Sequence, residues 1–144
     1  MRNERPLAVF AVLQQFKPDV YPKVDDEATI VLTYPNTQVV IQASWNWPID
    51  RKDIEIYGTA GYVKAPNATD LIWRISEREQ EQSAKLTPQG SLTLAPFYHF
   101  AAAMRGDVIV TPDHLSSLEN NLMTTEILDA ARESARTGKS VSLK

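Results

Sequence analysis

The sequence predicts an α+β fold, in which an open, mostly antiparallel sheet of about six strands carries helices on one face. Short segments with the two-residue alternation of strands fill the first half of the chain. Two segments with helical periodicity follow in the second half. Strands first and helices second are typical of α+β layers. At 144 residues, without a linker or low-complexity tract, the whole chain is expected to form a single domain.

Three strands are predicted before residue 48. Residues 7–16 are apolar at both parities over most of their length, so we expect a strand covered on both faces. Residues 28–34 alternate between apolar and polar side chains. Residues 38–47 follow a Pro-Asn turn signal and should pair antiparallel with the preceding strand.

A hairpin is predicted over residues 53–63, where apolar and polar residues alternate on both sides of a short connection. Gly58 and Gly61 are expected to supply the positive φ angles that such a connection needs. Residues 71–75 predict a further strand. Residues 77–85 are highly charged, so they are predicted to be an exposed excursion or a frayed strand.

Two helices are predicted after the strands. The first covers 96–105, opened by a proline and ended by Gly106. Its apolar residues recur at helical spacing and are expected to form one buried stripe: Phe97, Phe100, Ala101 and Met104. The second begins at a Thr-Pro pair, covers 112–137 and ends at Gly138. Residues 141–143 could then add an edge strand.

Composition argues against several functions. A net charge of -3, with 15 scattered Lys and Arg, predicts neither a nucleic-acid surface nor membrane binding. The absence of cysteine and of an export signal fits a cytoplasmic protein. None of the five glycines forms a G-x-G-x-x-G or P-loop motif, so no residue is assigned to a cofactor. His99 and His114 are the only histidines, and no metal site is predicted.

The segment around Trp45 and Trp47 is the first candidate for function. Two tryptophans on one strand face are typical of a core or an interface. They also come at the end of the strand, where Asn46, Asp50 and Arg51 add polar groups. Indole faces beside amide and guanidinium donors suit a sugar or a polyol, so both interpretations stay open.

Two further sites have alternative interpretations. His99, beside Tyr98, is predicted on the helix side away from the apolar stripe, either facing solvent or donating into a polar cleft against a partner domain. Glu119 and Glu126 fall inside the apolar stripe of the second helix. They are expected to form a salt bridge or lie at a rim, with a catalytic pair as the alternative.

Several motifs in this order resemble the C-terminal domain of the Gfo/Idh/MocA oxidoreductases, the glucose-fructose oxidoreductase, inositol dehydrogenase and rhizopine-catabolism family. The motifs are Tyr21-Pro22 with Asp25-Asp26-Glu27-Ala28, Tyr34-Pro35-Asn36, the strand ending in Trp45, Glu55 to Gly61, and Ala130 to Val141. The similarity begins at about Pro6 and covers nearly the whole chain.

The resemblance implies two domains with different roles. In this family an N-terminal Rossmann domain holds NAD or NADP, while an α+β domain shapes the substrate pocket and dimerises through its open sheet. This sequence resembles most of the second part only. The family's Glu-Lys-Pro lysine and Asp-x-x-x-His helix are absent, so no catalytic residue is assigned. Trp45, Asn46 and Trp47 match residues that line the substrate site in relatives, and Tyr98 and His99 match the pocket-facing start of a helix.

The predicted function is therefore the substrate-binding and dimerisation domain of an NAD(P)-dependent oxidoreductase acting on a sugar, polyol or related hydroxyl compound, inactive alone. Its partners would be its own Rossmann domain and a second copy. The copy would bind the sheet face that carries Thr29, Thr33, Gln42 and Ser44. The alternative is a stand-alone, non-catalytic binding or assembly module, which a native gene starting near Met1 would favour.

Overall fold

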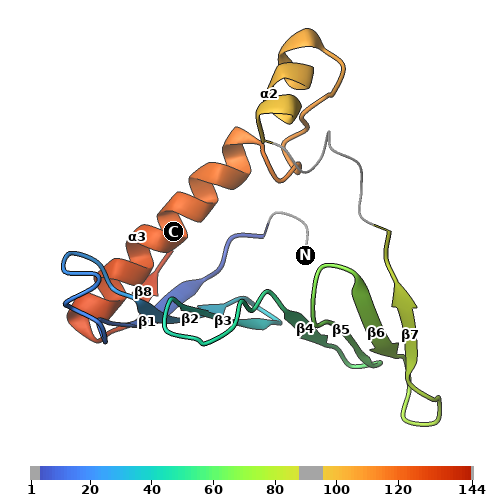
Figure 1. The fold of residues 1–144 in the computed structure, drawn as a ribbon, viewed down its shortest axis with the longest axis horizontal. Helices are drawn as coiled ribbons and strands as arrows, with labels where there is room; N and C mark the ends of the chain where they lie inside the picture. The colour runs from blue at the N-terminus through green and yellow to red at the C-terminus, as the bar shows by residue number, and fades with distance from the viewer. Residues whose placement is uncertain (1–3, 88–95, 144) are drawn as a thin grey trace. The chain divides into compact units, whose positions relative to one another are not determined.

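The computed structural model describes residues 4–87 and 96–143, which group into two compact units. Unit 1 comprises residues 1–46 and 109–144, and unit 2 comprises residues 47–108. Unit 1 contains β1 (Ala8–Gln14), β2 (Glu27–Thr33), β3 (Gln38–Ser44), α3 (Leu118–Thr137) and β8 (Val141–Ser142). Unit 2 contains β4 (Ile54–Tyr57), β5 (Tyr62–Ala65), β6 (Asp70–Arg74), β7 (Gln82–Lys85) and α2 (Pro96–Arg105) (Figure 1). The single domain stays a prediction.

The predicted α+β class and the antiparallel pairing are confirmed, but the strands form two sheets rather than one. Sheet A has the order β3-β2-β1-β8, and sheet B has the order β4-β5-β6-β7. Sheet A ends soon after β3, where the Trp45 N–H donates to the Asp26 carbonyl. The next strand, β4, begins only at Ile54 and belongs to sheet B. The charged segment also pairs as a strand, with Lys85 opposite Asp70.

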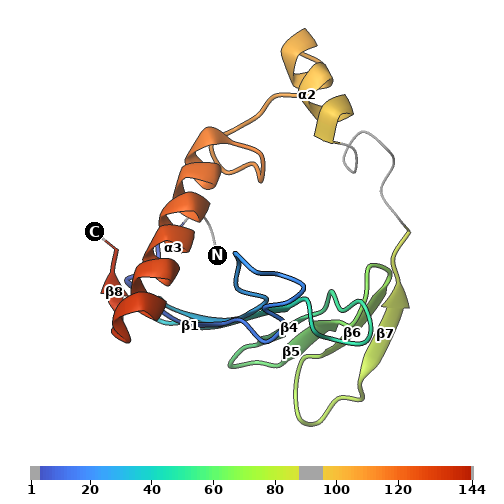
Figure 2. The same ribbon diagram turned by 60° about the vertical axis from the view of Figure 1, so that its left-hand side comes forward.

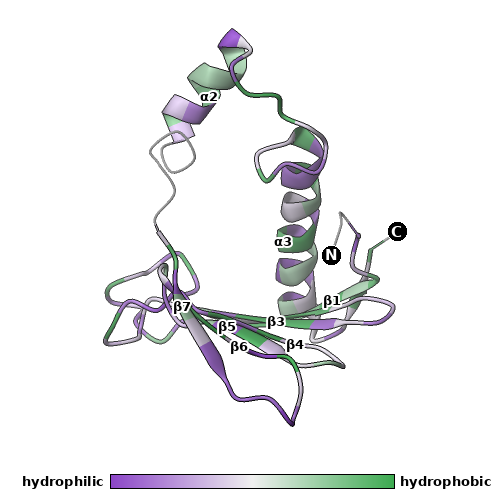
Figure 3. Cartoon of the chain, turned by 90° about the vertical axis from the view of Figure 1, so that its right-hand side faces the viewer, coloured by the Kyte–Doolittle hydropathy of each residue, from purple (hydrophilic) through white to green (hydrophobic). Residues whose placement is uncertain are grey.

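The core of unit 1 lies between sheet A and α3, which runs across one face of the sheet in Figure 2. Its buried members come from two neighbouring strands and from one face of the helix: Val9, Ala11, Ile30, Leu32, Ala130 and Ala131. Figure 3 shows β1 and β3 coloured mainly as hydrophobic. Because side chains alternate along a strand, only every second residue of β1 and β2 can reach the helix.

The opposite face of sheet A is not covered within the described chain. Phe10, Val12 and Val40 are 41%, 47% and 57% exposed on it. The register aligns Phe10 with Val31 and Val31 with Val40, so these side chains share one face. The same register puts the predicted set on this face: Thr29, Thr33, Gln42 and Ser44. The prediction that residues 7–16 are covered on both faces is therefore wrong for the isolated chain.

Helix α3 ends as predicted but begins later. Gly138 takes the left-handed conformation, with φ of 67°, and its N–H bonds to the Ser134 carbonyl. At the other end the N-cap is Ser117, whose hydroxyl accepts from the Asn120 N–H. The predicted start at Thr111 is wrong because residues 111–117 form turns instead. The serine satisfies an N–H that would otherwise lack a partner, as a good N-cap does.

Helix α2 has the predicted bounds, and Gly106 follows it with φ of 80°. The predicted buried stripe is wrong, however. Phe97, Phe100 and Met104 are 88%, 65% and 73% exposed, and the buried residue of this helix is Ala102. Periodicity correctly located the helix, but in the described residues its apolar stripe is uncovered.

The glycines of the central hairpin serve another purpose than the one predicted. Positive φ angles occur at Gly106 and Gly138, not at Gly58 or Gly61. A Cβ on Gly61 would lie only 2.0 Å from the Arg74 carbonyl oxygen, whereas one on Gly58 would meet nothing closer than 3.7 Å. Gly61 is therefore needed for the close approach of two backbones, not for an unusual turn.

Candidate functional site

A cluster of polar and aromatic side chains lies where β2 begins and β3 ends. We call it the strand-end cluster: Tyr21, Asp26, Glu27, Ser44, Trp45 and Asn46. Asp26 is its centre and is only 3% exposed. Its carboxylate accepts from the Phe16 and Lys17 N–H groups, each at 2.8 Å. The end of β1 is thus joined to the start of β2.

The ionised form of Asp26 is favoured in the folded protein. Burial acts against the charge, which alone would raise the pKa of this carboxyl. The hydrogen bonds from the Phe16 N–H, the Asn46 side chain and the Lys17 N–H together outweigh burial, so the pKa is lowered from its usual value. The cluster therefore contains a fixed negative charge at neutral pH.

Asn46 is held by this charge. Its amide nitrogen donates to the Asp26 side chain at 3.0 Å and to the Asp26 carbonyl at 3.2 Å, and it lies 3.4 Å from Glu27 Oε2. The Asn46 N–H also donates to the Ser44 hydroxyl at 2.9 Å, and that hydroxyl donates to Glu27. The Asn46 side-chain oxygen is buried and has no hydrogen-bond partner among the described residues. The amide is thus oriented, and its acceptor is left without a partner.

Trp45 forms the aromatic part of the cluster. Its ring packs against Tyr21 with centroids 4.9 Å apart and an interplanar angle of 59°. The Tyr21 loop is itself tethered, because the Gln15 side chain donates to the Tyr21 and Val24 carbonyls. Trp45 nevertheless stays 60% exposed. A tilted ring pair with one open indole surface can stack on an apolar face of a ligand.

Trp47 and Arg51 belong to unit 2 and contact each other. The Arg51 guanidinium carbon lies 5.0 Å from the Trp47 ring centroid, within cation–π range. Arg51 also donates to Asp53 through Nε at 2.6 Å and through a terminal nitrogen at 2.9 Å. This pair raises the pKa of Arg51 and lowers that of Asp53. Arg51 is therefore already oriented, and its other N–H groups are left for a ligand.

Tyr98 and His99 lie in the first turns of α2. Tyr98 is 67% exposed, and His99 is partly buried. Neither of the two predicted roles of His99, facing solvent or donating into a cleft, is tested by this arrangement. The six predicted residues therefore comprise Trp45 with Asn46 in unit 1, Trp47 with Arg51 in unit 2, and Tyr98 with His99 on α2.

Glu119 and Glu126 of α3 are exposed, so they are not the buried carboxylates that the apolar stripe suggested. Glu126 forms an ion pair with Arg5, with both side chains nearly half exposed. This matches the predicted salt bridge or rim position. Glu119 lies in the first turn of α3, where a negative charge complements the helix dipole.

The N-terminus of α3 does not suit a pyrophosphate. The N-terminus of α3 is capped by Ser117 and carries Glu119, and a carboxylate there repels a pyrophosphate. Within 4–87 and 96–143, no group of three or more His, Cys, Asp or Glu side chains could hold a metal ion. None of the helices in that part of the chain has both the length and the apolar character that a bilayer crossing requires.

Sequence reasoning missed Asp26 and Glu27 as members of the site. A signal was present, because Asp26 has the same strand parity as the buried Ile30 and Leu32. A carboxylate on the core side of a strand needs partners, and two backbone N–H groups supply them. The three consecutive acids Asp25, Asp26 and Glu27 do not by themselves show which one is buried.

Comparison with known proteins finds one family model that matches the first part of the chain. The GFO/IDH/MocA C-terminal domain matches residues 1–64. The family resemblance inferred from the sequence motifs is thereby confirmed over this part of the chain. No match was found among curated proteins.

Solved structures share the fold over almost the whole chain. A protein from Thermotoga maritima that is described as an oxidoreductase has a TM-score of 0.76 at 23% identity. The match covers 96% of this chain and 41% of that protein. A second protein described as an oxidoreductase, from Klebsiella pneumoniae, has a TM-score of 0.71 at 20% identity. The match covers 97% of this chain and 44% of that protein. An inositol dehydrogenase homolog from Azotobacter vinelandii, complexed with NADH and myo-inositol, has a TM-score of 0.66 at 15% identity, covering 96% and 44%. The chain thus spans less than half the length of these structures.

Proposed function

We propose that this chain, whose first 64 residues match the GFO/IDH/MocA C-terminal domain, is the substrate-binding and dimerisation domain of an NAD(P)-dependent oxidoreductase. The observation that carries the proposal is the match of at least 96% of the chain to 41–44% of each compared oxidoreductase. The substrate would be a sugar, polyol or related hydroxyl compound. We place the protein in the cytoplasm, in keeping with a chain that has no cysteine.

The cofactor would be held by a partner Rossmann domain, because this sequence has no G-x-G-x-x-G or P-loop motif. NAD or NADP would supply hydride acceptance or donation when bound there. The part of this chain would be to bind and orient the hydroxyl compound. An uncovered apolar stripe on α2, formed by Phe97, Phe100 and Met104, is a surface that such a partner domain could cover.

Trp45 and Asn46 are the residues of the strand-end cluster that we propose as substrate contacts. The open surface of the Trp45 ring can stack on the C–H face of a sugar or cyclitol. The free acceptor of Asn46 suits a hydroxyl donor, provided that a small shift uncovers it. Trp47, Arg51, Tyr98 and His99 stay predictions of substrate contact.

The open face of sheet A is the proposed dimer interface. It combines exposed apolar residues with uncharged polar ones, among them Phe10, Val40, Thr29 and Gln42. A second copy of the same face would bury these apolar side chains. The charged residue that shares their face, Glu27, lies at the end of β2 and accepts from the Ser44 hydroxyl. Without such a partner, these large apolar side chains would stay exposed to water, which is unfavourable.

Cofactor binding tests the proposal. Isothermal titration of the purified chain with NAD and with NADP is expected to show no saturable heat. Micromolar binding of either nucleotide would contradict the proposal that another domain holds the cofactor. A titration with myo-inositol and with glucose, followed by tryptophan fluorescence, should give a weak, saturable change that Trp45→Phe removes and Trp73→Phe keeps. Loss of the response in the Trp73 variant alone would argue against the strand-end cluster.

Sedimentation velocity tests the interface. The chain is expected to sediment as a dimer at tens of micromolar. Val40→Lys places a charge at the centre of the open face and should give a folded monomer, since Val40 is exposed in the single chain. Ile49→Lys, at a loop residue that is 74% exposed, is the matched control and should stay dimeric. A monomeric wild-type chain would overturn this part of the proposal.

A further inference from the structure

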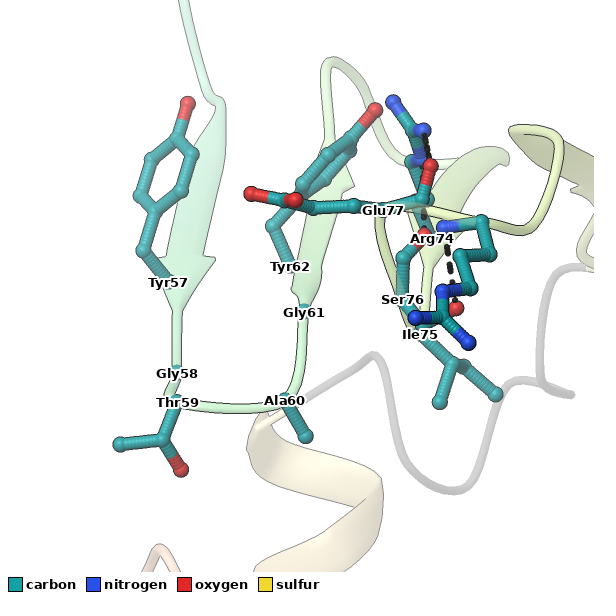
Figure 4. A pocket seen from close by; sticks show the side chains of 11 residues that line it. Tyr57, Gly58, Thr59, Ala60, Gly61, Tyr62, Arg74, Ile75, Ser76 and Glu77 are labelled. Carbon is teal, nitrogen blue, oxygen red and sulfur yellow. Dashed lines mark hydrogen bonds between the residues drawn. The ribbon is translucent and has the colours of Figure 1, made fainter.

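Unit 2 contains a pocket that shares no residue with the six predicted site residues. It has a volume of about 670 Å³ and is lined by residues 57–62 of the hairpin and residues 74–78, which include the end of β6 and the loop after it. Small-molecule sites typically measure roughly 300–1,000 Å³. Figure 4 shows the pocket with Tyr57 and Tyr62 projecting to the same side of neighbouring strands.

Two tyrosines give the pocket a fixed aromatic wall. Their ring centroids lie 5.9 Å apart, with an interplanar angle of 44°. The Tyr57 hydroxyl donates to Glu55 and the Tyr62 hydroxyl donates to Glu81, each at 2.6 Å. The Lys64 ammonium lies 5.7 Å and 5.0 Å from the two ring centroids. The rings are therefore held in place, and Tyr57 is still 65% exposed for contact with a ligand.

The polar lining combines a hydrogen-bond acceptor with a donor. The Glu77 carboxylate and the Arg78 guanidinium have no hydrogen-bond or ion-pair partner among the described residues. Figure 4 shows the Glu77 side chain reaching toward the space between the two tyrosines. Arg74 is already used, because it donates to the Ser76 carbonyl at 2.9 Å and to the Glu77 carbonyl. A ligand must therefore donate a hydrogen bond to the Glu77 carboxylate and accept one from the Arg78 guanidinium.

We propose that this pocket binds a neutral, polyhydroxylated ligand, a saccharide or cyclic polyol. A hydroxyl group can donate to Glu77 and accept from Arg78, so one kind of group serves both side chains. The apolar C–H face of such a ring stacks on the tyrosine wall. Because Glu77 and Arg78 of the lining carry opposite charges, a neutral ligand that both donates and accepts suits them better than an ion of either sign.

The experiment uses the chain itself and resolves the binding residue by residue. The backbone amide signals of the ¹⁵N-labelled protein are followed by NMR during titration with methyl glucoside, maltose and myo-inositol, and separately with phosphate and citrate. At least one neutral ligand should give saturable shifts in residues 58–61 and 74–78, with a Kd on the order of 1–10 mM. Shifts confined to Trp45 and Asn46 would instead report the proposed substrate site.

Three variants test the assigned roles. Tyr57→Ala should weaken the neutral ligand by about tenfold, because the open stacking surface is removed. Glu77→Gln and Arg78→Ala should each weaken it by roughly threefold to tenfold. Glu79→Gln and Arg132→Ala are the matched controls at exposed positions outside the pocket, and they should bind like the wild type.

Two outcomes would overturn the proposal. One is the absence of saturable shifts around the pocket with all three neutral ligands. The other is saturation by phosphate or citrate alone, lost in Arg78→Ala and strengthened in Glu77→Gln, which would make the pocket an anion site. Because all five variants change exposed side chains, unchanged amide spectra without ligand should confirm that each is folded.

Discussion

Sheets A and B have the same number of strands and the same antiparallel pairing, but they differ in burial. Sheet A places four residues, Val9, Ala11, Ile30 and Leu32, in the core against α3. No strand residue of sheet B is fully buried, and Ile54 and Ile56 are 57% and 55% exposed. Identical backbone pairing thus coexists with very different side-chain burial.

The difference shows what holds each sheet together. Sheet A is stabilised by removing apolar surface from water, which is the main favourable term in folding. Sheet B depends on backbone ladders and on cross-strand side-chain pairs, such as Tyr57 opposite Tyr62 and Glu55 opposite Lys64. Such pairs contribute roughly 0.2–1 kcal/mol each. We therefore expect sheet B to be the weaker of the two in the isolated chain.

The largest expected effect separates equivalent truncations in the two sheets. Leu32→Ala removes a core side chain that is 5% exposed and should lower the free energy of unfolding by about 3 kcal/mol. Ile56→Ala, the matched change in sheet B, should cost less than about 1 kcal/mol. Chemical denaturation followed by circular dichroism measures both. Equal losses would show that sheet B has a core of its own.

The next largest effect distinguishes the two glycines of the hairpin. Gly61→Ala forces a Cβ into the Arg74–Ile75 backbone and should cost about 2 kcal/mol. Gly58→Ala is the control, because its new methyl group makes only ordinary contacts and should change stability by less than about 1 kcal/mol. The measurement is again denaturant unfolding. A tolerated Gly61→Ala would mean that the two backbones are farther apart than described.

A buried hydrogen bond between α3 and sheet A gives a smaller effect. The fully buried Ser134 hydroxyl accepts from the Ala11 N–H at 2.9 Å. Ser134→Ala leaves that N–H without its partner and should cost about 1–2 kcal/mol. Ser142→Ala, at an exposed hydroxyl, should be nearly neutral. Thermal unfolding of the two variants compares them, and a neutral Ser134→Ala would argue that water replaces the hydroxyl.

The smallest effect is a pH dependence in unit 1. The folded state lowers the pKa of Asp26 below its usual 3.8, so it binds this proton less readily than the unfolded state. The resulting stability is fully present above pH 3.8 and is lost as the pH falls through the lowered pKa. Asp26→Asn should therefore flatten the acid limb of the stability curve below about pH 4. An unchanged acid limb in urea titrations at several pH values would contradict this assignment.

The sequence was sufficient for the elements themselves. Alternation located the strands, and both helices end at the predicted glycines, Gly106 and Gly138. Two propensities misled. The Thr-Pro pair at 111–112 is a good helix start, but Ser117 provides the cap. The two hairpin glycines suggested positive φ angles. Gly61 is instead required because the backbone of Arg74, 13 residues away in sequence, leaves no room for a Cβ.

Burial and contacts at the site could not be predicted in the same way. Periodicity shows which side chains share a face, but not whether another element covers that face, as the exposed stripe of α2 illustrates. Similarly, Trp45 and Asn46 were found from their residue types, whereas the buried Asp26 that orients Asn46 depends on the folded loop. Strand parity can indicate that Asp26 is buried, but it does not show that the partner of this residue is Asn46, 20 residues away.

The difference between the sheets is tested most directly by native-state hydrogen exchange, which measures opening free energies residue by residue. We predict that the ladder amides of Val9, Ile30 and Leu32 exchange only through opening of unit 1 as a whole. The ladder amides of Ile56, Val63 and Trp73 should exchange with a distinctly smaller opening free energy. Equal protection of the two sets would contradict the conclusion that burial against α3 makes sheet A the more stable sheet.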